Sequence, residues 1–147
     1  MARPTDGSAA HMGVHWPRGV LELARSAYVA DLDSHPETPG VFTRWLVAAV
    51  EQHLARTPAE RAAVSQQLDG VPRGHGNSRA HRVGAELIDP IKQAIIRDRR
   101  ELGRFVSRSR FVLEVVTAAA STARNWLGQP LPPPPRLLAN RPPRPRR

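Results

Sequence analysis

The chain of 147 residues contains no cysteine, a single lysine and few aromatic residues. The absence of cysteine excludes a disulfide scaffold and zinc sites built from thiolates, and it fits a cytoplasmic protein. No apolar run approaches the roughly 20 residues that a membrane-spanning helix needs. Residues 1–10 also lack the apolar core of a signal peptide. We therefore expect one cytoplasmic domain, away from membranes, whose core depends mainly on alanine, valine and leucine.

Positive charge increases along the chain. The net charge is −1 for residues 1–56, +2 for 57–83, +3 for 84–128 and +5 for 129–147. Apart from Lys92 the basic residues are arginines, which form forked hydrogen bonds with phosphate and guanine. A GC-rich genome would produce the same preference for arginine. The positive balance nevertheless favours a polyanionic partner, most often nucleic acid.

The first half of the chain has the pattern of a strand followed by two helices. Residues 11–16 alternate, with Met12, Val14 and Trp16 on one side and His11, Gly13 and His15 on the other. Pro17 suits the first turn of a helix with one apolar face. Thr38-Pro39 predicts the N-cap of a second helix that ends near Arg56. We call residues 11–56 unit 1.

The second half repeats this pattern. Residues 78–83 are a short strand candidate, a helix ends at Gly103, and another runs from Val106-Ser107 to about Leu127. We call residues 78–128 unit 2. Residues 57–77 are predicted to be a linker with a short helix, which starts at a capping-box pattern, Thr57 with Glu60. Residues 1–10 and the proline- and arginine-rich residues 129–147 are predicted to be disordered.

A shift of 67 positions superposes the two units without a gap. Trp16 then meets Val83, Val20-Leu21 meets Leu87-Ile88, and Ala48-Ala49 meets Val115-Val116. Identities are few, and the agreement lies in apolar phase and element length, which predicts a duplication. Each unit is too small to hold a core alone. We therefore expect a mainly α fold with a short two-stranded antiparallel β-ribbon, one strand from each unit.

Residues 14–25, Val-His-Trp-Pro-Arg-Gly-Val-Leu-Glu-Leu-Ala-Arg, resemble the strand end and first helix of the Arc/MetJ-like ribbon-helix-helix DNA-binding family. Residues 82–89 and 106–113 are similar to the same family. The resemblance implies tandem ribbon-helix-helix units that pair within one chain or between two chains. The family places its ribbon in the major groove of double-stranded DNA. The inter-helix connections are longer here than in compact members of the family.

The resemblance also implies which residues meet DNA. The outward ribbon residues would be His11, Gly13, His15, Ser78, Ala80 and Arg82, although Gly13 and Ala80 stand where the family usually has a polar base-reading side chain. Arg82 is the foremost candidate, because arginine donates twice to guanine; a phosphate contact or a solvated surface is the alternative. Starts of the second helices would meet phosphates through Thr38 and Gly40 in unit 1, and Ser107, Arg108, Ser109 and Arg110 in unit 2. Ordinary helix capping is the alternative there.

Other residues suggest structure rather than chemistry. Trp16, Trp45, Phe111 and Leu113 are expected in the core, and Asp31 and Asp98 on solvated helix faces. The six histidines do not form a convincing metal site, because His11 and His15 would lie about 13 Å apart on a strand. No set of nucleophile, base and orienting residue is recognisable. We therefore expect no metal, no cofactor and no enzymatic activity.

These expectations favour a sequence-specific DNA-binding protein, most often a transcriptional repressor in such families. A plasmid partition centromere-binding or conjugation accessory protein would use the same surface. A small helical protein-interaction module with incidental charge is the alternative from another class. The arginines of residues 129–147 would add salt-dependent affinity for DNA, and Pro132–Pro135 could instead dock in an aromatic groove of a partner.

Overall fold

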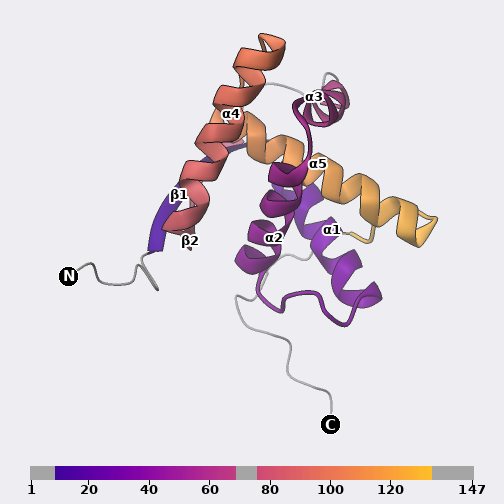
Figure 1. The fold of residues 1–147 in the computed structure, drawn as a ribbon. Coiled ribbons are helices and arrows are strands. Elements are labelled where there is room, and N and C mark those ends of the chain that lie inside the picture. The colour runs from indigo at the N-terminus through magenta and orange to yellow at the C-terminus, as the bar shows by residue number, and fades with distance from the viewer. Residues whose placement is uncertain (1–8, 69–75, 134–147) are drawn as a thin grey trace.

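The computed structural model describes residues 9–68 and 76–133. The fold is mainly helical with one two-stranded sheet, which confirms the expectation at this level (Figure 1). In this described part, no helix has the length and hydropathy required to cross a membrane. In chain order the elements are β1 (Ala9–Pro17), α1 (Val20–Ser34), α2 (Phe42–Ala55), α3 (Pro58–Gln66), β2 (Gly76–Gly84), a 3-10 turn (Ala85–Leu87), α4 (Ile88–Leu102) and α5 (Arg108–Leu127).

Strands β1 and β2 form an antiparallel ribbon in which Ala9 pairs with Gly84 and Pro17 with Gly76. The two predicted strands therefore exist and pair with each other. Ala9 and Ala10 belong to β1, so the expectation of disorder is wrong for these two residues, while residues 1–8 lie outside the described part. Pro17 ends β1 and does not enter a helix. Gly19 turns the chain with a φ of 88°, and α1 begins only at Val20.

The predicted offset of 67 positions recurs in the bounds of the elements. Moved by this offset, β1 coincides with β2, since Ala9 meets Gly76 and Pro17 meets Gly84. Helices α1 and α4 then differ by one residue at each end, and α5 extends further than α2 at both ends. The central rung pairs Gly13 with Ala80, which are themselves 67 positions apart. The ribbon pairing is therefore symmetric about this rung.

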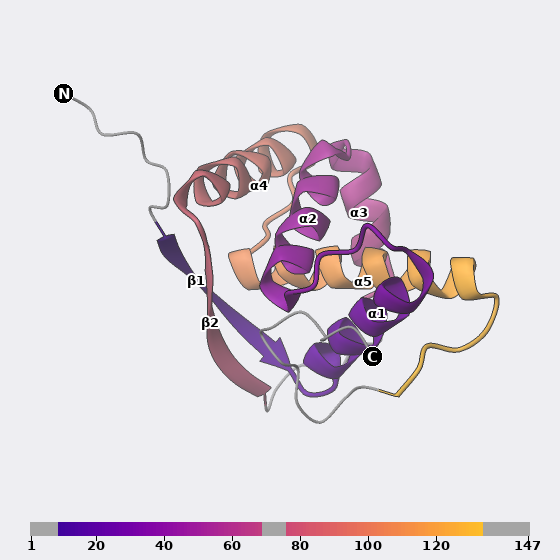
Figure 2. The ribbon, with the colours of Figure 1, turned by 90° about the horizontal axis from the view of Figure 1, so that it is seen from below.

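The inward face of the ribbon is buried against the helices along β1. Met12, Val14 and Trp16 are at most 2% exposed, because alternate residues of a strand point to the same side. Figure 2 shows the ribbon along one side of the helical body. Helix α5 contacts all four other helices and β1. The four residues expected in the core, Trp16, Trp45, Phe111 and Leu113, are all buried there, which confirms that prediction.

Two of the three predicted helix caps form as the sequence indicates. Thr57 and Glu60 make a reciprocal capping box at the start of α3, and the Ser107 hydroxyl accepts the Arg110 N–H at 3.0 Å. The third prediction is wrong. The Thr38 hydroxyl donates to the carbonyl of Asp31 at 3.0 Å, and α2 begins at Phe42 without a side-chain cap.

The predicted linker contributes a buried arginine to the body of the protein. Arg61 of α3 is 1% exposed, and its Nη2 lies 2.6 Å from Oδ1 of Asp98 in α4. Asp98 is fully buried, so the expectation of a solvated position is wrong. It is also wrong for Asp31, which is half-buried and accepts a hydrogen bond from Trp45 Nε1 at 2.8 Å. Both carboxylates are held by partners distant in sequence.

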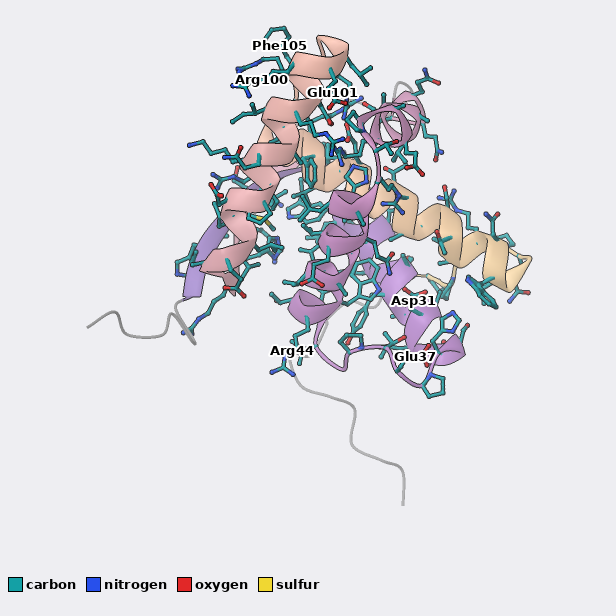
Figure 3. The ribbon with its side chains drawn as sticks, in the orientation of Figure 1. Asp31, Glu37, Arg44, Arg100, Glu101 and Phe105 are labelled. Atoms are coloured by element: carbon teal, nitrogen blue, oxygen red, sulfur yellow. The ribbon has the colours of Figure 1, made fainter. Side chains whose placement is uncertain are left out.

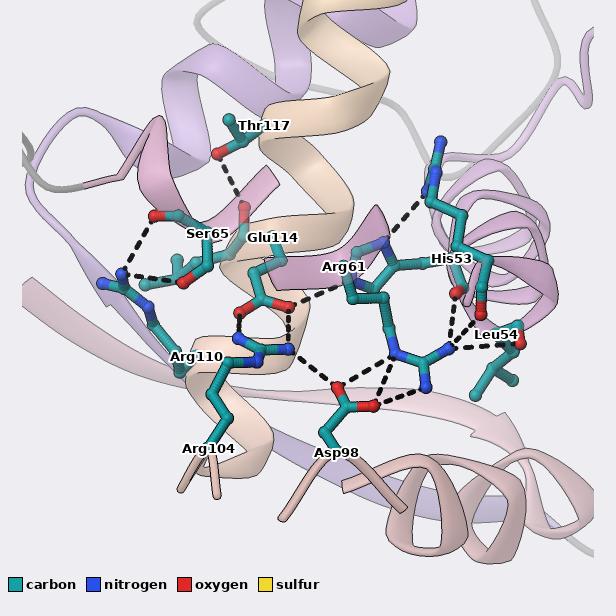
Figure 4. A network of polar contacts seen from close by, with 11 residues as sticks. His53, Leu54, Arg61, Ser65, Asp98, Arg104, Arg110, Glu114 and Thr117 are labelled. Carbon is teal, nitrogen blue, oxygen red and sulfur yellow. Dashed lines mark hydrogen bonds and ion pairs between the residues drawn. The ribbon is translucent and has the colours of Figure 1, made fainter. Parts of the chain in front are cut away.

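Asp98 belongs to a polar network that joins α2, α3, α4 and α5 (Figure 4). Arg104 bridges the two buried carboxylates, with Nη2 2.7 Å from Asp98 Oδ2 and Nη1 2.5 Å from Glu114 Oε2. The other Glu114 oxygen lies 3.0 Å from Nε2 of His53. Nδ1 of His53 faces Arg56 Nη1 at 3.0 Å. Because arginine only donates, Nδ1 accepts this bond, Nε2–H donates to Glu114, and the imidazole is neutral.

Acidification is expected to destabilise this fold from about pH 6.5 downward. Burial lowers the pKa of His53 from its ordinary 6.5 and outweighs the opposing effect of Glu114. Burial also lowers the pKa of His81, whose Nε2 accepts the Trp16 indole N–H at 2.9 Å. With both folded-state pKa values lowered, the unfolded chain binds more protons, so stability present above pH 6.5 is lost as pH falls through the folded-state values.

A second loss should follow at lower pH. Burial alone would raise the pKa of Asp98 and of Glu114, but the hydrogen bonds from Arg61, Arg104 and His53 outweigh it and lower both values. Protonation of these carboxylates in the unfolded state, below about pH 4.5, therefore removes further stability. Urea unfolding at intervals from pH 8 to pH 3 measures both steps. A midpoint that stays constant between pH 7 and pH 5 would contradict the role given to the histidines.

Candidate functional site

The face of the ribbon opposite the core is exposed and holds all six predicted ribbon residues. Cross-strand pairs in an antiparallel ladder project to the same side. The pairs are His11 with Arg82, Gly13 with Ala80, and His15 with Ser78, and each of these residues is exposed. The register therefore brings together on one surface residues that are more than 60 positions apart in sequence.

The two ends of this face differ in chemistry. At one end Arg82 stands opposite His11, so a guanidinium and an imidazole are available to a ligand. At the other end His15 Nδ1 lies 3.4 Å from the Ser78 hydroxyl, so the two side chains use part of their hydrogen-bonding capacity on each other. The middle rung, Gly13 and Ala80, carries no polar side chain. A side chain at Gly13 would meet no atom within 4 Å, so the middle of the face can be approached closely.

The start of α5 lies against the end of the ribbon. The Ser109 hydroxyl accepts the backbone N–H of His15 at 2.9 Å, which fixes this helix start beside β1. Arg108 is exposed, whereas Arg110 reaches back to the carbonyl and the hydroxyl of Ser65 at 3.3 and 3.1 Å. Three of the four residues predicted at this helix start, Ser107, Ser109 and Arg110, therefore line one hollow beside the ribbon, with Ser107 acting as the cap, and Arg108 does not line it. The lining of this hollow includes His15, Ser65, Arg104, Phe105, Ser107, Ser109 and Arg110.

In unit 1 the predicted residues Thr38 and Gly40 precede the helix instead of starting it. Thr38 faces Asp31, so the reason for assigning these two residues to a phosphate is lost. The start of α2 lies beside a second hollow next to the ribbon. This hollow is lined by Leu21, Arg25, Phe42, Thr43, Arg79, Ala80, His81 and Arg82. Three of these residues are arginines and none is acidic.

Sequence reasoning missed Arg25 and Arg79. Arg25 lies on the border of the apolar face of α1, and its buried Nε has no hydrogen-bond partner in the described part of the chain. Arg79 has the parity of the inward ribbon face, yet it is exposed, unlike its cross-strand partner Val14. The available signal was charge alone: Arg79 and Arg82 are two of the four arginines in residues 57–83.

The described residues include no group of three histidine or acidic side chains arranged to hold a metal ion. Comparisons with family models, with curated proteins and with solved structures find no match to this chain. The ribbon face and the two hollows beside it form the candidate functional surface.

Proposed function

We propose that this chain binds double-stranded DNA sequence-specifically, by inserting the exposed face of its β-ribbon into the major groove. A two-stranded ribbon fits this groove, which is about 12 Å wide. Nine residues per strand give a length of about 30 Å. The observation that carries the proposal is the exposed face formed by His11, Arg82, His15 and Ser78. These side chains can donate hydrogen bonds to base edges, and Arg82 suits guanine best.

Units 1 and 2 are proposed to act as tandem ribbon-helix-helix units folded on each other within one chain. The symmetry of the ribbon about Gly13 and Ala80 supports this, as do the matching bounds of α1 and α4. The start of α5 flanks β1, and the start of α2 flanks β2. Because both helix starts lie beside the ribbon, their N–H groups are suited to contact phosphates on either side of the groove.

Arginines beside the ribbon are proposed to contact phosphates. Replacing Arg25 and Arg79 by glutamine should reduce the slope of log affinity against log salt by about 0.9 for each phosphate that is no longer neutralised, without changing sequence preference. Arg97, an exposed arginine of α4 paired with Glu101, provides the matched control, and its replacement should leave the slope unchanged. Filter binding at several salt concentrations measures this. A weaker preference together with an unchanged slope would assign the two arginines to bases.

We propose transcriptional repression in the cytoplasm as the role of a site of this kind, without catalysis or a cofactor. Binding to a plasmid partition or transfer locus would use the same surface. Footprinting on the DNA that flanks the gene separates the two roles. Protection that overlaps a promoter supports repression, and protection of iterated repeats near a partition or transfer locus supports the other role.

A gel shift of the full chain on mixed-sequence duplex DNA at low salt tests the binding itself. Retarded complexes are expected, and competition with unlabelled duplexes should select a preferred sequence. No shift at low salt would contradict DNA binding and favour a helical protein-interaction module. The predicted contribution of the tail arginines to DNA affinity concerns residues beyond 133, which lie outside the described part. In this assay they add only their positive charge.

A further inference from the structure

A second candidate site lies at the end of the molecule away from the ribbon. The C-terminal ends of α1 and α5 meet there, with the ring centroids of His35 and Trp126 5.0 Å apart. Trp126 is 67% exposed, whereas the other two tryptophans are at most 4% exposed. The cleft beside it has a volume of about 280 Å³, and its lining includes Ala48, Ala49 and Ala119. Its other lining residues include Asp31, Glu37, Pro39 and Trp45.

The chemistry of this cleft suits a cation with an apolar or planar body. Asp31 and Glu37 contribute two carboxylates, and no arginine or lysine of the described residues lines the cleft. Figure 3 places both carboxylates at the end of α1 and in the loop after it, away from the ribbon. An exposed indole attracts a guanidinium through its π face. Aromatic side chains together with proline also form the grooves that hold extended proline-rich segments.

The chain itself contains a segment of this chemistry, which begins eight residues after Trp126, a residue of the cleft. Residues 134–147 contain five arginines, five prolines and no acid. The chain leaves α5 through Gly128, two residues after Trp126, with a φ of 62°. It then turns back toward α1 (Figure 2), and Leu131 packs against the core. Because Ser109 contacts the ribbon and Trp126 is 17 residues further along α5, Trp126 lies about 25 Å from that contact, and the segment follows Trp126 after seven intervening residues.

We propose that the cleft binds residues 134–147 of the same chain, with arginine guanidinium groups at Asp31, Glu37 and Trp126 and prolines against the indole. Fourteen residues in extended polyproline conformation span about 43 Å, which is ample reach. The short connection gives the segment a high effective concentration at the cleft. Held there, its arginines are withdrawn from other anionic partners. The proposal does not depend on DNA binding by the ribbon.

Acrylamide quenching of Trp126 tests this in the full chain at low salt. The Trp126 component is the difference between each protein and its Trp126→Phe counterpart, since the remaining tryptophans are buried. One variant replaces all five tail arginines by glutamine, and its quenching constant should rise about twofold because the segment no longer covers the indole. A control variant removes three exposed cations from α4, namely Lys92→Gln, Arg99→Gln and Arg100→Gln, and should leave the constant unchanged.

Further measurements identify the occupant. Glu37→Gln should move the quenching constant toward that of the five-glutamine variant, and 0.5 M salt should bring wild type and variant together. Equal constants for wild type and the five-glutamine variant at low salt overturn the proposal. Protection of Trp126 that increases with protein concentration also overturns it, because the segment would then come from a second copy. Circular dichroism confirms that these exposed substitutions leave the fold intact.

Discussion

Replacing Asp98 by alanine is expected to lower the free energy of unfolding by about 3–5 kcal/mol. The substitution leaves Arg61, which is 1% exposed, without the carboxylate that neutralises it. It also removes one of the two anions that hold Arg104. An uncompensated buried charge is among the few causes of losses this large. Folded domains are commonly stable by about 5–15 kcal/mol, so this loss is a large fraction of the total stability. Urea unfolding of the wild type and the variant measures it.

Glu101 provides the matched control for Asp98 on the same helix. It pairs with Arg97, but both side chains are about half exposed or more, so Glu101→Ala should cost less than about 0.5 kcal/mol. Asp98→Asn keeps one acceptor oxygen and should lose less stability than the alanine variant. If Asp98→Ala and Glu101→Ala lose similar amounts, the network does not hold the helices together as described.

The fold was predictable where a local pattern repeats. The alternation of residues 11–16 identified one strand directly. Residues 78–83 alternate poorly, and their strand was predicted only because the following helix matched the first unit at a fixed offset. Pairing of these strands was predicted because each unit is too small to form a core without the other. The capping signals at Thr57 and Ser107 were also sufficient, because they act over three residues.

Contacts distant in sequence were not predictable. Asp98 occupies an ordinary position for a charged helix residue, and its burial depends on Arg61, which lies in a segment interpreted as a linker. Thr38-Pro39 has the composition of a helix start, but the Thr38 hydroxyl donates to the Asp31 carbonyl, and α2 begins three residues after Pro39. The hollow beside α2 needs Arg25 and Arg79 from different elements. Sequence periodicity predicts on which side of a helix or strand a residue lies, but it does not predict which distant residue contacts it.

Replacing Arg82 by alanine is expected to remove most of the sequence preference for DNA while leaving nonspecific binding largely intact. Arg82 is exposed at the end of the ribbon face opposite His11, with its side chain directed away from the core. A bidentate arginine–guanine contact contributes about 1–3 kcal/mol of discrimination, which corresponds to roughly a 5- to 150-fold difference in affinity. Competition between the selected duplex and mixed-sequence duplex measures the ratio.

Variants of two other arginines distinguish base recognition by Arg82 from a simple loss of positive charge. Arg97→Ala removes the same charge from the exposed surface of α4 and should change neither affinity nor preference. Arg79 lies on the same strand, but its parity turns it away from the outward face, so Arg79→Ala should weaken binding to all sequences alike. If Arg82→Ala behaves like Arg79→Ala, with a smaller salt slope and an unchanged preference, then Arg82 contacts phosphate. If it behaves like Arg97→Ala, the ribbon face is not the surface that meets DNA, because its strongest hydrogen-bond donor would have no part in binding.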